Sequence, residues 1–360
     1  MITGCIFLLL LGGCGESDDG VRVVRVWDEN STDSSSSEEV VRESGITDRV
    51  GMVTDVGGID DASFNQSAWE GLQALEQSWE IQTSYIDSES EADFYDNFAK
   101  EAAEGCGLCW GIGFGCADAL LQIAQDRPRT HFAIVDSSFE NTPDNVTAVV
   151  FRAQEPSFLV GYIAAAATHT GKVGFVGGVR GEIIDQFQYG FQAGVDYGAA
   201  LYGKNVEITI EYADSFGDEQ KGYEIAKAMY RSGCDIVYHA AGATGVGVIW
   251  AAKDNGKYVI GVDKDQSALA PENILTSAMK KVDIAVERVS ESYLRGEAIG
   301  GKTISFGLTE GAVGIPEEHK NYRDEIYDSA LMIADRIKAG EIVPPKSAEE
   351  YEAFRVTLKQ

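Results

Sequence analysis

The stretch TDVGGIDDASFNQSAWEGL, residues 54–72, concentrates residue types that can bind a ligand or do chemistry. It holds three aspartates, two adjacent glycines and a Phe64-Asn65 pair, between a short apolar run and a helix-like pattern. Carboxylates can bind metals or transfer protons, glycine-rich loops can hold phosphates, and aromatic rings can stack on flat ligands. The segment is a candidate phosphate, metal, catalytic or neutral-ligand loop.

The spacing of these residues argues against the first two interpretations. No Gly-Lys-Ser/Thr triplet follows the glycines, which excludes a P-loop. The positions of Asp55, Asp60 and Asp61 do not match an EF-hand loop. Asp60 and Asp61 suit the start of a helix instead, where a carboxylate can cap free amides. Elsewhere, the GFG triplet at residues 113–115 lacks the third glycine of a dinucleotide fingerprint.

Signatures of catalysis are sparse. None of the four histidines lies in a recognisable triad or zinc pattern, and no Gly-x-Ser-x-Gly elbow occurs. Asp55 and Asp263 could form the carboxylate pair of a glycosidase. The sequence favours a protein that is not an enzyme and that needs no cofactor.

Four cysteines lie in the expected mature chain. Cys106-x-x-Cys109 with Cys116 could indicate a zinc or redox site. Cys109 lies in an apolar run, however, and the only further thiol is Cys234. We therefore favour small buried thiols or a single disulfide, and expect no bound metal.

Apolar runs and helical patterns alternate from residue 49 onward, and the series restarts near residue 172. Such alternation predicts parallel sheets with helices on both faces, and two series predict two similar lobes. Ligands of such sheets bind beyond the carboxyl ends of the strands, so residues that directly follow strands are candidates for a site. They are Asp55, residues 57–65, Gly113, Phe114, Asp136, residues 177–187, Gly242 and Asp263.

The charge balance restricts the partners. The 360 residues include 58 acidic and 29 basic side chains, a net charge of −29. Such a surface repels nucleic acid and anionic lipid headgroups, so we expect no nucleic-acid partner.

The N-terminus is typical of an exported protein. Residues 1–13 form a predicted signal peptide whose apolar run is too short to span a membrane. The sequence LGGC at residues 11–14 resembles a bacterial lipobox, which implies cleavage before Cys14 and lipid attachment to its sulfur. An ordinary signal peptide with a chance cysteine is the alternative. Residues 14–46 then form a polar tether, and the protein is expected to be extracytoplasmic and lipid-anchored to the cell membrane.

Several segments together resemble the basic membrane lipoproteins, the purine nucleoside receptor A-like substrate-binding proteins of ABC transporters. They are VGMVTDVGGIDDASFNQSAWEGL, FRAQEPSFLVGYIAA, VGFVGG, IGVDKDQ and TSAMKKVD. The resemblance covers residues 48–340. It implies an α/β type I periplasmic-binding-protein fold with two Rossmann-like lobes joined by a three-strand hinge. The expected lobes are residues 47–150 with 278–307 and residues 151–277 with 308–360, with crossings near residues 151, 277 and 308.

The resemblance also implies a ligand site between the lobes. It assigns stacking faces to Phe64 and Phe187, and polar contacts with a base to Asp55, Ser63 and Asn65. Gly242, Asp263 and Lys280 fall where a ribose is held. The loop 179–187 lacks a proline expected near Ile183 or Ile184, so Phe191 or Tyr189 is the alternative to Phe187. Asp136 is interpreted as structural, and Lys280 could instead orient Asp263.

The function implied is capture of purine nucleosides of the adenosine, guanosine and inosine class for uptake through the permease subunits of an ABC transporter. A negative cleft favours nucleosides over nucleotides. The alternatives are a nucleoside-cleaving enzyme, a sensor on the same fold, and a protein that binds another small ligand such as a sugar.

Overall fold

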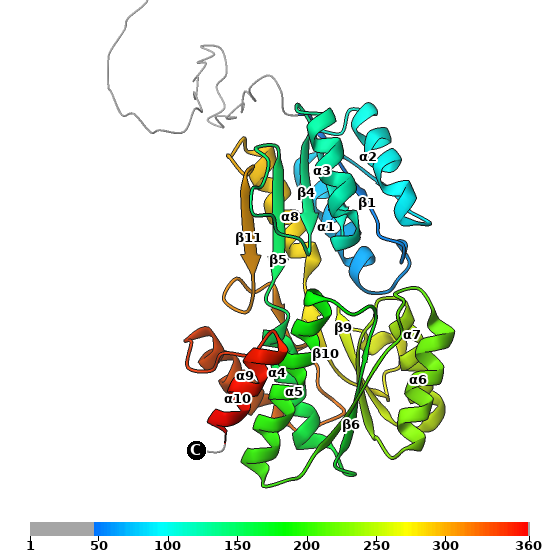
Figure 1. The fold of residues 1–360 in the computed structure, drawn as a ribbon, viewed down its shortest axis with the longest axis vertical. Coiled ribbons are helices and arrows are strands. Elements are labelled where there is room, and N and C mark those ends of the chain that lie inside the picture. The colour runs from blue at the N-terminus through cyan, green and yellow to red at the C-terminus, as the bar shows by residue number, and fades with distance from the viewer. Residues whose placement is uncertain (1–46, 359–360) are drawn as a thin grey trace, which may run out of the picture. The chain divides into compact units, whose positions relative to one another are not determined.

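Two six-stranded sheets organise residues 47–358, which are the residues described by the computed structural model of this chain. The predicted signal peptide (residues 1–13), Cys14 and the predicted tether up to residue 46 lie outside the described residues. Each sheet forms the centre of one lobe (Figure 1).

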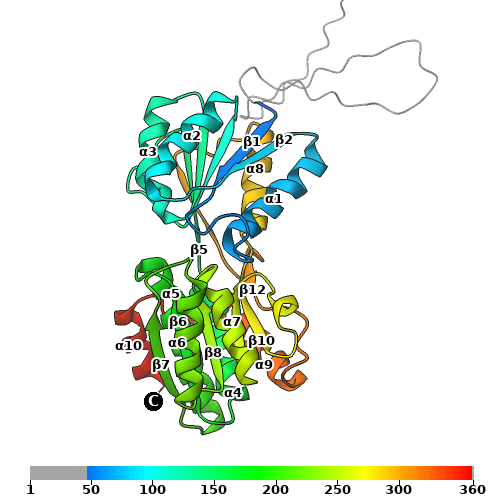
Figure 2. The ribbon, with the colours of Figure 1, turned by 90° about the vertical axis from the view of Figure 1, so that its right-hand side faces the viewer.

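The first lobe contains a fully parallel sheet with the strand order β11-β5-β4-β3-β1-β2. Its strands are β1 (Arg49–Val53), β2 (Gln82–Ile86), β3 (Leu108–Ile112), β4 (His131–Val135), β5 (Val146–Phe151) and β11 (Lys302–Phe306). Helices α1 (Phe64–Trp79) and α8 (Val282–Leu294) pack together on one face, and α2 (Phe94–Ala103) and α3 (Ala117–Asp126) cover the other (Figure 2). Strand β3 is apolar and wholly buried because helices cover both sides of it.

The second lobe repeats this order as β12-β10-β9-β8-β6-β7, with only the short β12 antiparallel among its described strands. The strands are β6 (Lys172–Gly177), β7 (Glu207–Tyr212), β8 (Ile236–Ala240), β9 (Tyr258–Asp263), β10 (Ile274–Lys280) and β12 (Val313–Gly314). Helices α4 (Gln154–Ala167) and α5 (Glu182–Tyr202) pack as one pair, and α6 (Glu219–Arg231) and α7 (Thr244–Asn255) as another. Helix α9 (Asp324–Lys338) packs on α4, and α10 (Ala348–Thr357) packs on α5.

The chain crosses between the sheets after β5, after β10 and after β11. The predicted fold class, two similar α/β lobes with a three-strand hinge, is confirmed by this topology. Strand β10 pairs with β12 as far as Lys280, so the second sheet extends three residues past the crossing expected near residue 277.

The C-terminal region differs from the sequence-based expectation. The sequence pattern predicts a final helix over residues 329–339, whereas α9 begins at Asp324 and a further helix, α10, follows it. A signal for α10 is present, because Ser347 caps the helix by accepting the backbone N–H of Glu350, and Ser-x-x-Glu is the capping-box pattern.

Cys106, Cys109, Cys116 and Cys234 are buried free thiols, so the disulfide alternative is wrong. Burial raises the pKa of the Cys109 thiol well above its ordinary value. Within residues 47–358, no group of three or more potential ligands could hold a metal ion. No helix in the same part of the chain is long and apolar enough to span a membrane.

Candidate functional site

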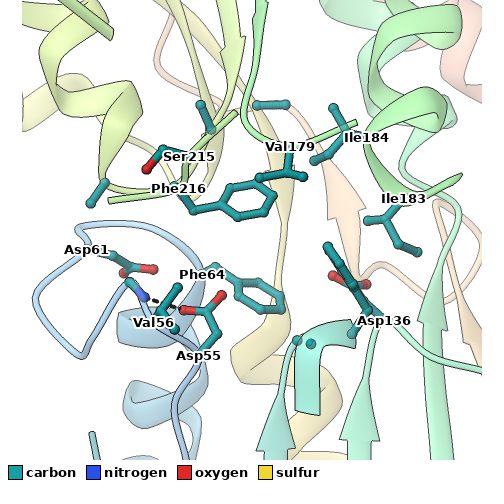
Figure 3. A pocket seen from close by; sticks show the side chains of 18 of the residues that line it. Asp55, Val56, Asp61, Phe64, Asp136, Val179, Ile183, Ile184, Ser215 and Phe216 are labelled. Atoms are coloured by element: carbon teal, nitrogen blue, oxygen red, sulfur yellow. Dashed lines mark hydrogen bonds between the residues drawn. The ribbon is translucent and has the colours of Figure 1, made fainter. Parts of the chain in front are cut away.

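A cavity of about 320 Å³ lies between the two lobes, at the carboxyl ends of their strands. Its volume is at the lower end of the range for small-molecule sites. Figure 3 shows Asp55, Phe64 and Asp136 of the first lobe facing Val179, Ile183 and Phe216 of the second. The position agrees with the general rule that doubly wound sheets bind ligands beyond their strand ends.

The structure brings six of the eight predicted ligand-binding residues to the wall of this cavity. They are Asp55, Phe64, Phe187, Gly242, Asp263 and Lys280. Phe64 is the first residue of α1, and Phe187 lies in the first turns of α5, so the two rings come from opposite lobes. The fallback ring Phe191 is buried in the core, and Tyr189 packs on Tyr351 of α10, with 5.9 Å between ring centroids.

Ser63 and Asn65, the other two predicted residues, lie behind the wall. Asn65 donates from Nδ2 to Asp55 Oδ1 at 2.7 Å, and its Oδ1 accepts the backbone N–H of Asp55 at 3.2 Å. Ser63 donates from Oγ to Asp263 across the lobes. Both side chains therefore orient a carboxylate of the cavity.

Asp61 caps helix α1, as the sequence suggested. Its carboxylate accepts the backbone N–H groups of Ser63, Asn65 and Gln66 at 2.8–3.1 Å. Burial nevertheless raises the pKa of Asp61 to about 7, because the cost of removing its charge from water exceeds the effect of these hydrogen bonds.

Lys280 forms a buried ion pair with Asp136, so the sequence-based pairing of Lys280 with Asp263 is wrong. The interpretation of Asp136 as merely structural also needs correction, because Asp136 lines the cavity. The Lys280 ammonium lies 4.4 Å from the ring centroid of Phe64 and 5.8 Å from that of Phe187. At these distances it attracts the faces of both rings and holds them near the ion pair.

Asp263 is the cavity carboxylate with spare acceptor capacity. Ser63 Oγ donates to its carboxylate, and Lys280 acts on it through its charge. Burial raises the pKa of Asp263 to about 6, against the lowering effects of Lys280 and Ser63. Burial likewise raises the pKa of Asp55, and its hydrogen bonds with Asn65 and Gly57 oppose that rise.

The same cavity has an apolar side, of which the sequence indicated Phe114 and residues 177–187 as candidates but did not indicate Phe216. Phe114 follows β3 and Phe216 follows β7, and their rings approach edge to face at 6.3 Å between centroids. Val179, Ile183 and Ile184 add aliphatic surface beside them. Phe114 and Val179 were detectable, since both follow predicted strands, but Phe216 lies four residues past its strand.

The charge of the wall is strongly asymmetric. Among the lining residues, the six acids outnumber the single cation Lys280, which is already paired with Asp136. The acids are Asp55, Asp61, Glu91, Asp136, Asp214 and Asp263. An anionic ligand would therefore be repelled.

Two similar parallel-sheet lobes, three crossing segments and a small cavity between the lobes define a two-lobed protein that binds small molecules. The family model described as "ABC transporter substrate-binding protein PnrA-like" (Bmp) matches residues 49–348. The chain belongs to this family of substrate-binding proteins.

Relatives support the assignment over nearly the whole chain. The "CD4+ T-cell-stimulating antigen" of Listeria innocua is 38% identical over 359 residues, covering 94% of this chain and 95% of the relative. "Basic membrane protein A" of Borreliella afzelii is 38% identical over 317 residues, covering 87% and 95%. A solved ABC transporter solute-binding protein from Aeropyrum pernix K1 is 26% identical with a TM-score of 0.77, covering 86% of this chain and 97% of the other.

Proposed function

We propose that this protein captures purine nucleosides of the adenosine, guanosine and inosine class in the interlobe cavity and delivers them to the permease of an ABC transporter. The observation that carries the proposal is that Phe64 and Phe187, from opposite lobes, line one small cavity together with Asp263. A flat base could stack on such rings, each contributing about 1–3 kcal/mol.

The polar groups suit the rest of a nucleoside. An ionised Asp263 can accept hydrogen bonds from both ribose hydroxyls, and charge-assisted bonds of this kind are the strong ones. Asp55, oriented by Asn65, can accept N–H donors of a base. The excess of carboxylates favours a neutral nucleoside over a nucleotide.

The proposal extends to location. Cleavage before Cys14 and lipid attachment there would hold the protein on the outer side of the cell membrane, beside the permease. Mass spectrometry of the membrane-extracted protein tests the attachment, and an unmodified Cys14 contradicts it.

Calorimetry with inosine tests the ligand assignment. We expect wild-type protein to bind inosine but not inosine 5′-monophosphate, and Asp263→Ala to lose about 3 kcal/mol, or roughly 100-fold in affinity, because two hydrogen bonds to a charged acceptor are lost. Asp265→Ala is the matched control, since Asp265 is an exposed aspartate in the same loop and bonds only the backbone N–H of Ser267.

Two results would contradict the proposal. An unchanged inosine affinity in folded Asp263→Ala protein would remove the ribose assignment. Release of free hypoxanthine during incubation with inosine would favour the nucleoside-cleaving alternative.

A further inference from the structure

Beside the cavity, two buried segments of opposite lobes are joined through the side chain of Gln266. Gln266 follows β9 in the second lobe, and its Nε2 donates to the backbone carbonyl of Ala62, which precedes α1 in the first lobe, at 3.1 Å. The Gln266 side chain is buried, with a residue exposure of 2%. Gln266 is not a lining residue of the cavity, so its contact joins the lobes without touching the ligand space.

The orientation of the Gln266 amide is fixed by the backbone. The N–H of Val262 points at one terminal atom of the amide at 3.0 Å, and a backbone N–H can only donate, so this atom must be the oxygen. The amide nitrogen is thereby directed across the cleft toward Ala62. The backbone N–H of Gln266 itself donates to Ser277 Oγ at 3.2 Å.

His239 supplies a second restraint on the same oxygen. Its Nε2 lies 3.1 Å from Gln266 Oε1, and because that atom is an acceptor, Nε2 must carry the proton. Nδ1 is then the unprotonated nitrogen, which agrees with its burial without a hydrogen-bond partner. Full burial lowers the pKa of His239 to about 4, so the ring is neutral at physiological pH.

Two glycines make room for this arrangement. A Cβ on Gly245 would lie 2.0 Å from His239 Nδ1, and a Cβ on Gly261 would lie 2.6 Å from both Gln266 Oε1 and Ser277 Oγ. At both glycines the backbone therefore lies directly against the His239 ring or the Gln266 amide, and this close packing restricts the position of the amide.

We propose that Gln266 is a positioning residue that latches the two lobes in the closed arrangement, with Val262 and His239 holding its amide toward Ala62. The latch lies next to the Ser63–Asp263 hydrogen bond, so closing one contact aligns the other. The inference rests on the proposed capture of a ligand between the lobes, to which it adds closure of the lobes, and it does not depend on the identity of the ligand.

The latch changes how much of the ligand-free protein is closed. A buried hydrogen bond contributes about 1 kcal/mol, which corresponds to a roughly fivefold change in the ratio of closed to open molecules. Ligand affinity scales with the closed, competent fraction, so weakening the latch weakens binding of any ligand of the cleft by a similar factor.

Pulsed electron–electron resonance tests the latch. Spin labels are placed at Asp96→Cys in α2 and Ala228→Cys in α6, two exposed positions in different lobes, with Cys5 and Cys14 replaced by serine. The four remaining cysteines are buried and will not react in the folded protein. Without ligand, we expect a closed population whose ratio to the open population falls about fivefold in Gln266→Met. Methionine has a similar volume but lacks both the donor to Ala62 and the acceptor of Val262 and His239.

Glu70→Gln is the matched control. It removes an exposed interlobe ion pair with Lys264, two residues from Gln266, and exposed ion pairs contribute little, so the distances should not change. If Gln266→Met does not fold, Gln266→Asn retains the amide but is one methylene too short to reach Ala62, and the same fall is expected.

Three outcomes would overturn the latch: no closed population in ligand-free wild type, wild-type distances in a folded Gln266 variant, or an equal shift in Glu70→Gln. Adding inosine to the same samples separates this inference from the nucleoside proposal. If inosine does not increase the closed population while the Gln266 effect persists, the ligand assignment fails and the latch stands.

Discussion

Asp136 and Asp263 occupy equivalent positions in the two lobes, since β4 and β9 are the corresponding strands of the two sheets. Both residues have a left-handed backbone, with φ of 65° and 63°, a conformation that aspartate tolerates better than most side chains. Their partners differ. Lys280 neutralises Asp136, whereas Asp263 bonds a serine hydroxyl. This asymmetry leaves Asp263 as the carboxylate available to a hydroxyl-bearing ligand.

The raised pKa of Asp263 predicts that ligand binding weakens in acid. A protonated Asp263 cannot accept from two hydroxyls, and hydrogen bonds from the ligand favour its ionised form. Because the pKa in the free protein is about 6, we expect the dissociation constant for inosine to be constant above pH 7 and to rise toward tenfold per pH unit below about pH 5.5. Calorimetry between pH 5 and 8 measures this profile.

Asp263→Asn provides the control for this profile, because an amide keeps the size of the carboxylate but does not titrate in this range. We expect weaker binding and a flatter profile in the variant. A wild-type affinity that is independent of pH from 5 to 8 would show that Asp263 does not contact the ligand as an ionised group.

The sequence could predict which residues surround the cavity better than it could predict how they pair. Asp55 and Asp263 were found because they follow buried strands, and Phe64 because of the family resemblance. The Lys280–Asp136 ion pair joins residues 144 positions apart in different lobes. Such a pair depends on how the lobes are placed against each other, and no local pattern encodes that placement.

At the scale of elements, periodicity predicted the alternation of strands and helices but not the weakly amphipathic C-terminus. Helix α10 has one buried side chain, Tyr351, and exposes Val356, so it shows no clear apolar stripe. It contacts α5 through Tyr351, which bonds Asp196 and packs against Tyr189, and it contacts α4 through Phe354, whose ring packs edge to face on Phe158. Only the Ser347 cap could have indicated where this helix begins.

Helices α4 and α5 approach so closely that glycine is required between them. A Cβ on Gly194 of α5 would lie 2.0 Å from the carbonyl oxygen of Phe158, and one on Gly161 of α4 would lie 2.3 Å from that of Phe191. Because backbone atoms are the obstacles, no side-chain rotation relieves the clash.

We therefore predict that Gly194→Ala lowers the free energy of unfolding by about 1–3 kcal/mol, the usual cost of overpacking, although alanine is the better helix former. Urea denaturation measures the change. Gly314→Ala is the control, because a Cβ there meets no atom within 4 Å. Equal stability of the Gly194 variant and wild type would mean that the two helices are not in this close contact.

At the scale of the whole molecule, the two lobes share one strand order and meet at a cavity rich in buried carboxylates. The repeated strand order and the number of crossings could be predicted because the apolar pattern occurs twice. The concentration of buried acids could not be predicted from the sequence, because the burial of these side chains depends on the closed arrangement of the lobes. Its consequence is a pH dependence of stability.

Asp61 and Asp263 have folded-state pKa values of about 7 and 6, above the ordinary 3.8, so the folded protein binds more protons than the unfolded chain between pH 4 and 7. Stability contributed by these groups therefore increases as the pH falls. His131 and His239 act in the opposite sense, since burial lowers the pKa of each to about 4, and they oppose folding below about pH 6.5. Below about pH 6.5 the two effects therefore oppose each other and largely cancel.

We expect the melting temperature of the wild type, relative to that of Asp61→Asn, to rise by about 1 °C between pH 8 and pH 6.5, because Asp61 takes up its proton there while the histidines affect both proteins equally. Differential scanning calorimetry measures the rise. Asp61→Asn is the reference because its amide does not titrate in this range, while its oxygen can still accept the N–H groups of Ser63 and Gln66 that cap α1. A difference between the two proteins that stays constant from pH 8 to 6.5 would mean that Asp61 is ionised without penalty in the folded protein. In that case the three backbone N–H groups, and not burial, determine its pKa.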